Sequence, residues 1–404
     1  MEKGNEICKR GAGFQASFTK MKAVMQWVLW TNVGLILYVY IGYPALLWLL
    51  NKLKGEWLVG FGESYEPRIS LIVAAHNEER VIAQKLENTL ELEYPRDKLE
   101  ILIVSDGSAD MTAEIVRRYT GRGVHLLELL QNYGKATAQN SAVEHATGEI
   151  LLFTDADVLL SPESLHQMIA HLSYDDVGCV VGRVVYSNER ETVVTKGENA
   201  YWRYELALRE QESRLGILAM GSGALIALRR SLFAPMDPGV SEDFVLPMNV
   251  AMKGYKTVYA SEVGARTELS QDRPGEMFRT KVRTITMDVR GVLICRAILN
   301  PLRYPFYAWG LTSHKLLRWM VPYFLIGILG INLMLMKYPV YRLIMGLQAA
   351  FYTLALAGYF WQKKGGAPKI AGIPFSFCLI NLAALVGVGG FVMGKKAGRW
   401  QPVR

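Results

Sequence analysis

Cysteine is scarce in this chain: 404 residues contain four cysteines, and none of them stands in a Cys-x-x-Cys pair. Their wide separation argues against both a zinc site and a disulfide framework. The six histidines show no paired spacing of metal ligands either. Two phosphate-binding patterns are also missing, a Gly-x-Gly-x-x-Gly turn after the first predicted strand and a Gly-Lys-Ser/Thr loop. Their absence disfavours a standard dinucleotide-binding fold and a nucleoside triphosphatase.

Charged residues are absent from four long apolar segments, residues 23–51, 319–336, 343–362 and 370–394. Each is close to the ~20 residues that cross the hydrocarbon core of a bilayer. We therefore predict one transmembrane helix at 25–50, before a soluble region, and two to three in 319–394. Pro374 interrupts the last segment. The first segment lacks a small-residue cleavage site, which argues against a cleaved signal peptide.

The net charge is +8, and lysines and arginines gather beside the apolar segments. Such clusters favour anionic head groups, and no aromatic-rich RNA-binding motif accompanies them. We therefore expect membrane lipids as partners and no nucleic acid. Lys52 and Lys54 indicate a cytoplasmic end of the first helix, so we expect a multi-pass protein of the inner cell membrane with a cytoplasmic soluble region. If three helices after that region crossed the membrane completely, Lys395 and Lys396 would lie outside the cell, against the positive-inside tendency. We therefore expect the last segment to be broken or partly re-entrant.

Apolar stretches alternate with helical patterns between residues 68 and 285. The predicted strands are Ile69–Ala74, Leu99–Val104, Val124–Leu127 and Ile150–Thr154, and the predicted helices are 79–90, 111–119 and 136–146. Strand, turn and helix repeated in this way indicate a doubly wound, mostly parallel α/β sheet. Continuous rather than alternating hydrophobicity fits strands that are covered on both faces.

Polar residues follow three of these strands, at 75–78, 106–108 and 155–157. The carboxyl edge of an open α/β sheet is where ligands bind. Asp155 and Asp157 are two positions apart, so a strand would point both carboxylates to one face. Hard oxygen ligands there suit Mg²⁺ or Mn²⁺ holding a diphosphate. A solvated turn is the alternative for so short a motif.

Four motifs in a fixed order make the chain resemble the family 2 glycosyltransferases of GT-A fold. They are Ile-Ser-Leu-Ile-Val-Ala-Ala-His-Asn-Glu-Glu at 69–79, Ser-Asp-Gly-Ser at 105–108, Asp-Ala-Asp at 155–157 and Ser-Glu-Asp at 241–243. The likeness extends to 201–205 and 221–224 and, with the apolar flanks, covers nearly the whole chain from Met25. The most similar group comprises membrane-bound exopolysaccharide, poly-N-acetylglucosamine and hyaluronan synthases. It implies metal-dependent inverting sugar transfer from a nucleotide sugar, usually a UDP-sugar.

The resemblance also implies roles on the donor side. The residues that would hold the base and ribose are Ala75, His76, Asn77, Glu78 and Asp106. Lys135 would lie near the nucleotide, with a solvated lysine as the alternative. Asp155 would contact the ribose or water around the metal and is a possible second ligand, whereas Asp157 would bind the metal directly. For Asp106, a turn-forming aspartate before glycine is the plainer interpretation.

On the acceptor side, Asp243 would be the general base and Glu242 its acidic neighbour. Inverting displacement needs one base on the acceptor hydroxyl and no enzyme nucleophile. The positive end of a helix dipole would favour the ionised acids, although Ser241 followed by acids is also an ordinary helix start. Gly221, Ser222 and Gly223 resemble the family's acceptor loop. Trp202 is expected either to stack on a sugar or to be a core aromatic.

One departure concerns the Gln-x-x-Arg-Trp motif of processive synthases. Residues 280–284 read Thr-Lys-Val-Arg-Thr, so Arg283 is retained for phosphate but the tryptophan is absent. This weakens the case for processivity. Three alternatives stay open: a polymerase extending a polysaccharide, which would call for an export partner subunit; single addition to a polyprenyl-phosphate-linked acceptor; and a non-catalytic channel or scaffold with a vestigial nucleotide pocket.

These observations divide the chain into seven parts. They are a polar N-terminal extension (1–24), a transmembrane helix (25–50), a linker (51–67), a GT-A domain (68–285), interfacial amphipathic helices (286–318), two to three transmembrane helices (319–394) and a basic tail (395–404).

Overall fold

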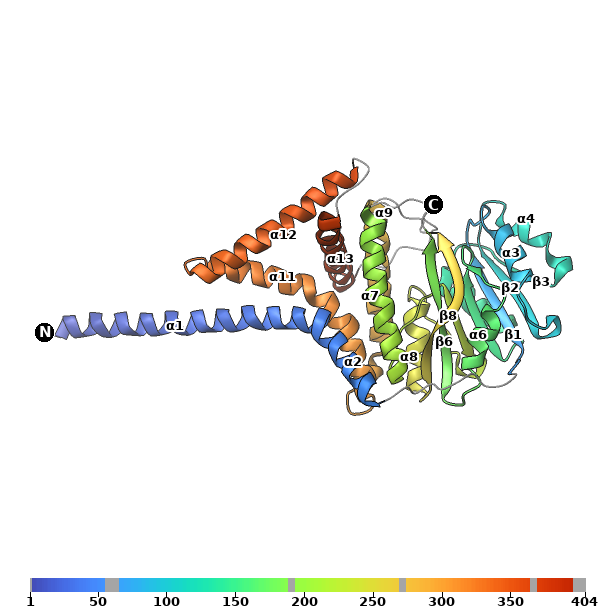
Figure 1. The fold of residues 1–404 in the computed structure, drawn as a ribbon, viewed down its shortest axis with the longest axis horizontal. Coiled ribbons are helices and arrows are strands. Elements are labelled where there is room, and N and C mark those ends of the chain that lie inside the picture. Colours follow the sequence, from blue (N-terminus) through green and yellow to red (C-terminus); the bar gives the residue numbers. More distant parts are fainter. Residues whose placement is uncertain (1, 55–64, 188–192, 269–273, 364–368, 395–404) are drawn as a thin grey trace.

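Two parts of the molecule lie along its long axis, a sheet domain at one end and a group of long apolar helices at the other (Figure 1). The structure is a computed structural model that describes residues 2–54, 65–187, 193–268, 274–363 and 369–394. Helices α7 (Val193–Leu215) and α9 (Pro274–Ile294) lie between the two parts. The predicted linker is described only at its ends, and the predicted basic tail lies outside the described residues.

The sheet has eight strands in the order β3-β2-β1-β4-β7-β6-β8-β5. Their bounds are β1 Ile69–Ala75, β2 Leu99–Asp106, β3 Val124–Leu129, β4 Ile150–Asp155, β5 Leu159–Leu160, β6 Val177–Ser187, β7 Leu225–Arg229 and β8 Lys256–Glu268. Strands β3, β2, β1 and β4 run parallel, as predicted. Strand β7 is antiparallel to both β4 and β6, while β6 and β8 are parallel to each other. The sheet is therefore mixed beyond β4.

Helices cover both faces of the sheet. One face carries α3 (Ile82–Leu90), α4 (Thr112–Arg117) and α6 (Ser164–His171), and the other carries α5 (Lys135–His145), α8 (Glu242–Met252) and α9. Along β1, Leu71 and Val73 face the first layer while Ile72 and Ala74 face the second, and all four are buried. This two-sided burial explains the unbroken apolar run and confirms the doubly wound α/β prediction. Short 3₁₀ helices connect these elements at Arg96–Lys98, Thr120–Arg122, Arg230–Leu232 and Arg296–Leu299.

Four helices among the described residues are long and apolar enough to cross a membrane, at Thr19–Lys54, Pro305–Met334, Pro339–Trp361 and Ile370–Val392. The first joins α1 (Glu2–Leu37), a π-helix at Tyr38–Gly42 and α2 (Tyr43–Lys54). The second joins α10 (Pro305–Leu311), a π-helix at Thr312–Leu316 and α11 (Leu317–Met334). The third and fourth are α12 (Pro339–Lys363) and α13 (Lys369–Val392). The sequence boundary drawn at 318 falls inside the second helix, and α13 continues through Pro374.

The two π-helices meet each other. The hydroxyls of Tyr38 and Ser313 are 2.8 Å apart, and the indole nitrogen of Trp309 donates to the Tyr38 hydroxyl at 2.9 Å. A π-turn contains one residue more than an α-turn, and such turns are frequently found at functional sites. Here the irregular turns bring polar groups of two apolar helices into contact.

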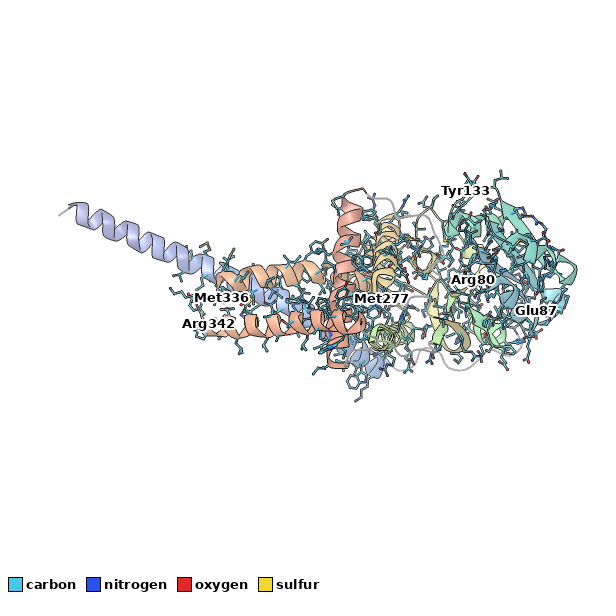
Figure 2. The ribbon with its side chains drawn as sticks, turned by 90° about the horizontal axis from the view of Figure 1, so that it is seen from above. Arg80, Glu87, Tyr133, Met277, Met336 and Arg342 are labelled. Carbon is cyan, nitrogen blue, oxygen red and sulfur yellow. The ribbon has the colours of Figure 1, made fainter. Side chains whose placement is uncertain are left out.

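Helix α13 runs across the direction of α1 and α12 in both overall views (Figures 1 and 2). It lies along α9: Met277 of α9 packs with Phe375, and the Thr286 hydroxyl donates to the carbonyl of Gly387 at 3.3 Å. In Figure 2, Met336 and Arg342 lie at the distal end of the long helices, whereas Met277 lies beside α13. Helix α13 therefore belongs to the layer between the sheet domain and the distal helices.

Candidate functional site

The strand register brings the predicted donor-side residues to one edge of the sheet. Ala75 is level with Ser105 of β2, and Ala74 is level with Asp155 of β4. Because these strands are parallel, the segments 75–78, 106–108 and 155–157 emerge side by side at their carboxyl ends. This is the edge at which open α/β sheets bind ligands.

Asp106 is fully buried, and its carboxylate holds the loop before α5. One oxygen accepts from the backbone N–H of Tyr133 and the other from that of Gly134, both at 2.8 Å. The next residue, Gly107, has a φ of +60°, and a β-carbon there would lie 2.3 Å from the carbonyl carbon of Gln131. The Asp-Gly pair thus has a structural function of its own, which was the plainer interpretation of this motif. Contact with a nucleotide would use the remaining lone pairs of the carboxylate.

The turn after β1 interlocks with the loop after β2. Asn77 has a positive φ of 54°, and its side-chain oxygen accepts from the backbone N–H of Ala109 at 2.8 Å. The backbone N–H of Glu78 donates to the Thr112 hydroxyl at 2.7 Å. The ring nitrogen Nδ1 of His76 lies 2.7 Å from the carbonyl oxygen of Asp106. These bonds join the two loops at the carboxyl edge of the sheet, where the predicted base and ribose contacts lie.

Asp155 and Asp157 do not share a strand. Strand β4 ends at Asp155, and Ala156 and Asp157 form a turn that the N–H of Val158 closes by donating to the Asp155 carbonyl at 3.3 Å. The alternation of strand side chains therefore does not orient this pair, contrary to the sequence argument. Both side chains are half-buried at the sheet edge.

Lys135 joins the two halves of the site. Its ammonium group, on the first residue of α5, donates to Asp155 and forms an ion pair with Glu242 at the start of α8. It also reaches the carbonyl of Gly223 at 3.5 Å. Burial lowers the pKa of Lys135, but the charges of Asp155 and Glu242 outweigh burial and raise it. A cation held in this way ties the strand end, the 221–223 loop and the helix start into one unit.

Asp243 lies beside this bridge, on the first turn of α8. Its side chain is half-buried and accepts a hydrogen bond from the Ser241 hydroxyl, and its carbonyl accepts from the N–H of Gly221 at 2.6 Å. A β-carbon at Gly223 would lie 2.6 Å from Oε1 of Glu242. A side chain at position 223 would therefore displace the Glu242 carboxylate from its place beside Lys135, a constraint that the sequence does not disclose. Burial and the neighbouring charges of Asp243 and Asp155 raise the pKa of Glu242, against the opposing effect of Lys135.

A cavity of about 120 Å³ opens on Asp243 from the side of the long helices. Trp202 lines this cavity and is half-buried, so it is not a core aromatic. The ammonium of Lys281 lies 5.1 Å from the centre of the Trp202 ring. Arg283 is not among the described residues that line the cavity. Burial lowers the pKa of Arg283, and the charge of Glu242 opposes this.

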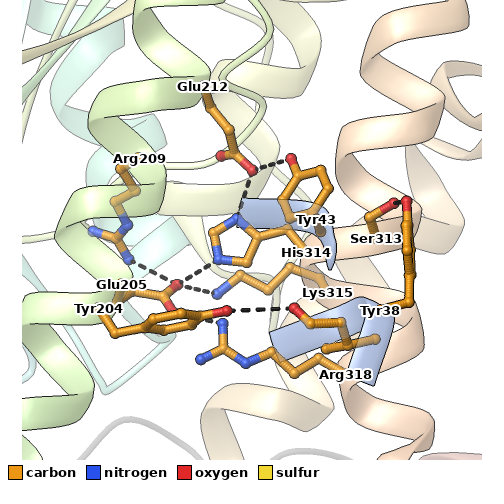
Figure 3. Close-up of polar contacts among 11 residues, drawn as sticks. Tyr38, Tyr43, Tyr204, Glu205, Arg209, Glu212, Ser313, His314, Lys315 and Arg318 are labelled. Atoms are coloured by element: carbon orange, nitrogen blue, oxygen red, sulfur yellow. Dashed lines mark hydrogen bonds and ion pairs between the residues drawn. The ribbon is translucent and has the colours of Figure 1, made fainter. Parts of the chain in front are cut away.

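A buried ion network joins α7 to the apolar helices (Figure 3), and four of its members, Glu205, Arg209, Lys315 and Arg318, also line the cavity. Glu205 of α7 accepts from Lys315 at 2.7 Å and from Arg318 at 2.8 Å. The ring of His314 lies between two carboxylates, 3.1 Å from Glu205 and 2.8 Å from Glu212. Burial raises the pKa of Glu205, but its contacts with Lys315, Arg318 and His314 outweigh burial and hold it well below the ordinary value. Glu205 lies in the stretch 201–205 to which the family likeness extends, but the ion network was not predicted from the sequence. His314 and Lys315 lie within the second π-helix, and Arg318 lies just after it.

Lys85 is a second residue that the sequence analysis missed. The buried positions of α3 are Ile82, Lys85, Leu86, Thr89 and Leu90, so a lysine occupies the apolar stripe of this helix. Its ammonium donates to the Thr154 hydroxyl at 3.1 Å and to the Val158 carbonyl at 2.5 Å. Burial lowers the pKa of Lys85 to about 7, while the charges of Asp155 and Asp157 oppose this. A charged residue at a core position of the stripe is the signal that could have identified it.

The carboxylates at the sheet edge suit a metal ion only together with a ligand. Among the described residues, no group of three or more histidine, cysteine, aspartate or glutamate side chains could enclose a metal. Mg²⁺ keeps several waters and is commonly bound through one or two carboxylates plus substrate phosphates, and Mn²⁺ prefers the same oxygen donors. Asp155 and Asp157 match that donor set.

Comparison with known proteins adds similarities in sequence to one family model and to three relatives. Residues 70–235 match the family model described as "Glycosyl transferase family 2". The chain is 28% identical over 200 residues to "Probable glycosyltransferase YdaM" of Bacillus subtilis (strain 168), which covers 47% of this chain and 48% of the relative. It is 32% identical over 154 residues to "Beta-monoglucosyldiacylglycerol synthase" of Trichormus variabilis, covering 37% and 33%. It is 26% identical over 199 residues to "Poly-beta-1,6-N-acetyl-D-glucosamine synthase" of Staphylococcus aureus, covering 47% and 47%.

These matches span about half or less of the curated relatives' length. A solved structure matches more of the molecule: "Mannosyltransferase PcManGT from Pyrobaculum calidifontis in complex with GDP-Man and Mn2+", with a TM-score of 0.67 and 26% identity. The match covers 88% of this chain and 99% of that chain, so the likeness extends beyond the sheet domain.

Replacing Lys85 by Met should weaken Mn²⁺ binding without unfolding the protein. The variant leaves a side chain of similar length but frees Thr154 and Val158, which flank the carboxylate turn. Replacing a group that orients metal ligands typically lowers metal affinity about 10- to 100-fold. We expect about a 10-fold loss in Mn²⁺ affinity, measured by calorimetry in the presence of UDP. Lys98→Met, at an exposed lysine, is the control, and equal affinities in the two variants would contradict a positioning role for Lys85.

Proposed function

Residues 70–235 of this chain are a glycosyl transferase family 2 domain, and we propose that the chain is a membrane-embedded, metal-dependent, inverting glycosyltransferase. The domain has the GT-A fold and uses a nucleotide sugar. Its acceptor, in this proposal, reaches the site from the membrane.

The observation that carries the proposal is the Lys135 bridge. It joins Asp155, at the edge where a donor would bind, to Glu242, which directly precedes Asp243. Asp243 in turn lines a cavity bounded by the long apolar helices. Donor-side and acceptor-side residues thus share one site, as direct transfer between two substrates requires.

The chemistry follows from these positions. The acceptor hydroxyl oxygen attacks the anomeric carbon, the bond from that carbon to the diphosphate breaks, and the configuration inverts. Asp243 takes the proton of the attacking hydroxyl, and the Ser241 hydroxyl orients its carboxylate. Asp157, with Asp155, would hold Mg²⁺ or Mn²⁺, which stabilises the negative charge of the departing diphosphate. Lys135 keeps Asp155 in place from the other side.

Two nucleotide donors are supported by different observations. The motif resemblance favours a UDP-sugar. The solved structure that matches 88% of this chain is a mannosyltransferase in complex with GDP-Man, which makes GDP-mannose the second candidate. Thermal-shift measurements with both nucleotide-sugar classes and Mn²⁺ distinguish them, because a ligand that binds only the folded state raises the melting temperature.

For the acceptor, we favour single addition to a lipid-linked molecule over extension of a polymer. Residue 284 is threonine where processive synthases carry tryptophan, and the cavity is bounded by helices able to cross a membrane. Extension of a polysaccharide with an export partner remains the alternative, and a ladder of products would establish it. A non-catalytic scaffold is less supported because the acidic positions that transfer needs are filled.

We also propose three membrane crossings, with the sheet domain in the cytoplasm. The helix ending at Lys54, the helix at Pro305–Met334 and α12 would cross, while α13 would lie along the membrane surface on the side of the sheet domain. The crosswise direction of α13 and its packing on α9 support this arrangement. Exposed apolar side chains such as Ile370, Ile373 and Leu382 would face lipid. The arrangement also puts the basic residues beyond α13 on the same side as Lys52 and Lys54, in accord with the positive-inside tendency.

Asp243→Asn should abolish transfer while leaving donor binding intact. The amide keeps the shape but cannot accept a proton, and loss of a general base costs about 10²- to 10⁴-fold in rate. The rate is measured as transfer of labelled sugar into membrane lipid at saturating donor, and binding as the thermal shift with donor and Mn²⁺. Asp237→Asn, at an exposed aspartate six positions earlier, is the control. Transfer by Asp243→Asn at the control rate would refute the assignment of the base.

Asp157→Ala should remove the dependence of UDP binding on metal. Without this carboxylate the ion loses its proposed direct ligand. We therefore expect the gain in UDP affinity that Mn²⁺ gives to be at least about 10-fold smaller in the variant than in the unmodified protein. Calorimetry with and without EDTA measures the difference. Exposed Asp97, replaced by alanine, serves for comparison; a full metal effect in Asp157→Ala would mean that the ion binds elsewhere.

The proposed topology predicts which side of the membrane each helix end faces. In a chain without its native cysteines, single cysteines are introduced at Met393, at Lys98 in the sheet domain and at Lys337 between α11 and α12, all of them accessible. A membrane-impermeant maleimide should label positions 393 and 98 from one side and position 337 from the other. Labelling of 393 together with 337 would mean that α13 crosses the membrane.

A further inference from the structure

The cavity beside Asp243 has an unusual lining. Four cationic side chains contribute to it, Arg209 of α7, Lys281 of α9, and Lys315 and Arg318 of the second apolar helix. Aromatic rings lie beside these cations: Lys281 is 5.1 Å from the ring centre of Trp202, and Arg318 is 5.1 Å from that of Tyr201. Rings hold cations in place without neutralising them, so their charge stays available to a ligand.

Two of these cations have buried donors that nothing in the described residues accepts. Nη2 of Arg318 and Nε of Arg209 are buried and make no hydrogen bond among the described residues. The side chains of Arg209 and Arg318 are only 7% and 10% exposed. A buried unsatisfied donor is destabilising, more so when it is charged, so such groups are rare in folded proteins and call for an explanation. Both side chains line the same cavity, and a ligand with acceptor oxygens would satisfy them.

Positive charge exceeds negative charge on this lining. Three acids face the four cations: Glu205, Asp243 and Asp288. Glu205 is already engaged by Lys315 and Arg318. Asp288 is 5% exposed, and its Oδ1 is buried without a hydrogen-bond partner among the described residues. Burial and the nearby charge of Asp243 raise the pKa of Asp288 well above its ordinary value, which favours its neutral form.

The other walls of the cavity come from the apolar helices. Tyr40 of the first, Trp319 of the second, and Ile380 and Asn381 of α13 complete the lining. By the measure in which one water needs about 10–15 Å³, a volume of about 120 Å³ holds a small polar group but not a lipid chain. An acceptor would thus insert its head between α7 and α9 and leave its apolar part against α13 and its neighbours.

We propose that this cavity binds the phosphate of a membrane-lipid acceptor, with Arg209, Lys281 and Arg318 as its ligands, next to the proposed base Asp243. The assignment rests on the proposed function, because it supplies the substrate class for the same site. Guanidinium groups bind phosphate through paired charge-assisted hydrogen bonds. A neutral diacylglycerol would leave the charge of these cations and the two buried donors uncompensated. A free sugar chain would satisfy the donors but not the charge.

The test compares two lipids that differ only in phosphate. Purified full-length protein in detergent is titrated with farnesyl phosphate and with farnesol, and the melting temperature is recorded. We expect farnesyl phosphate to raise the melting temperature and farnesol, diacylglycerol and an N-acetylglucosamine oligosaccharide not to. Equal shifts from farnesol and farnesyl phosphate, or no shift from either, would overturn the proposal. An equal shift from inorganic phosphate at the same concentration would overturn the lipid part and identify a site for free anions.

A matched pair of variants locates the effect. Lys281→Gln removes a cation of the cavity, and Arg279→Gln removes an exposed cation two positions earlier on the same helix. We expect about 10-fold weaker binding of farnesyl phosphate to Lys281→Gln and unchanged binding to Arg279→Gln. Equal behaviour of the two variants would exclude the cavity as the binding site. Neither replacement touches the Glu205 ion network, so both proteins are expected to fold.

Failure of this inference can be told apart from failure of the proposed function. If only the headgroup assignment is wrong, labelled sugar passes from donor to an acceptor without phosphate, such as diacylglycerol, at full rate. If the proposed function itself is wrong, no nucleotide sugar with Mn²⁺ shifts the melting temperature and no labelled product forms with any acceptor, whatever farnesyl phosphate does.

Discussion

The ammonium group of Lys135, held between Asp155 and Glu242, is the interaction on which the site depends. Strand β4 and helix α8 are separated by nearly ninety residues, and each carries a carboxylate that would repel the other at this distance. A single buried cation turns that repulsion into attraction from both sides. It also reaches the carbonyl of Gly223 in the 221–223 loop, where the missing β-carbon leaves room for the Glu242 carboxylate. The donor edge and the start of α8 therefore act as one rigid piece, and Asp243 takes its position from that piece.

Part of this arrangement can be predicted from sequence because it rests on local patterns. The unbroken apolar runs at β1, β2 and β4 predict strands buried on both faces, and the polar residues directly after them predict the ligand-binding edge. The orientation of Asp157 was not predictable, because the strand ends at Asp155 and a turn carries the next carboxylate. Lys85 carries a local signal, a lysine within the apolar stripe of α3, but its partners Thr154 and Val158 are distant in sequence. The partners of Glu205 are distant as well, so neither set of contacts was predictable.

The sheet domain and the apolar helices are joined by a buried ion network as well as by apolar packing. Glu205 of α7 accepts from Lys315 and Arg318, and Glu212 accepts from Tyr43 at 2.5 Å and faces His314. Removing one partner from such a buried network leaves an uncompensated charge and is strongly destabilising. The complete network contributes little net free energy to folding. Its value lies in specifying a single relative position for α7 and the second apolar helix. The cavity beside Asp243 is formed at this junction, so its shape depends on the network.

The paired π-turns have a consequence for how the two apolar helices can change. Each turn contains one residue more than a regular α-turn would, and beyond it every side chain is rotated by about 100° around the helix axis. Tyr38 and Ser313 meet within these turns, and Tyr204 donates to the carbonyl of Val39 at 3.3 Å. Deleting a residue from one helix alone would turn Tyr43, or Lys315 and Arg318, away from their carboxylates. Insertions and deletions in these helices should therefore be inherited as a compensating pair, and homologous chains should carry both extra residues or neither.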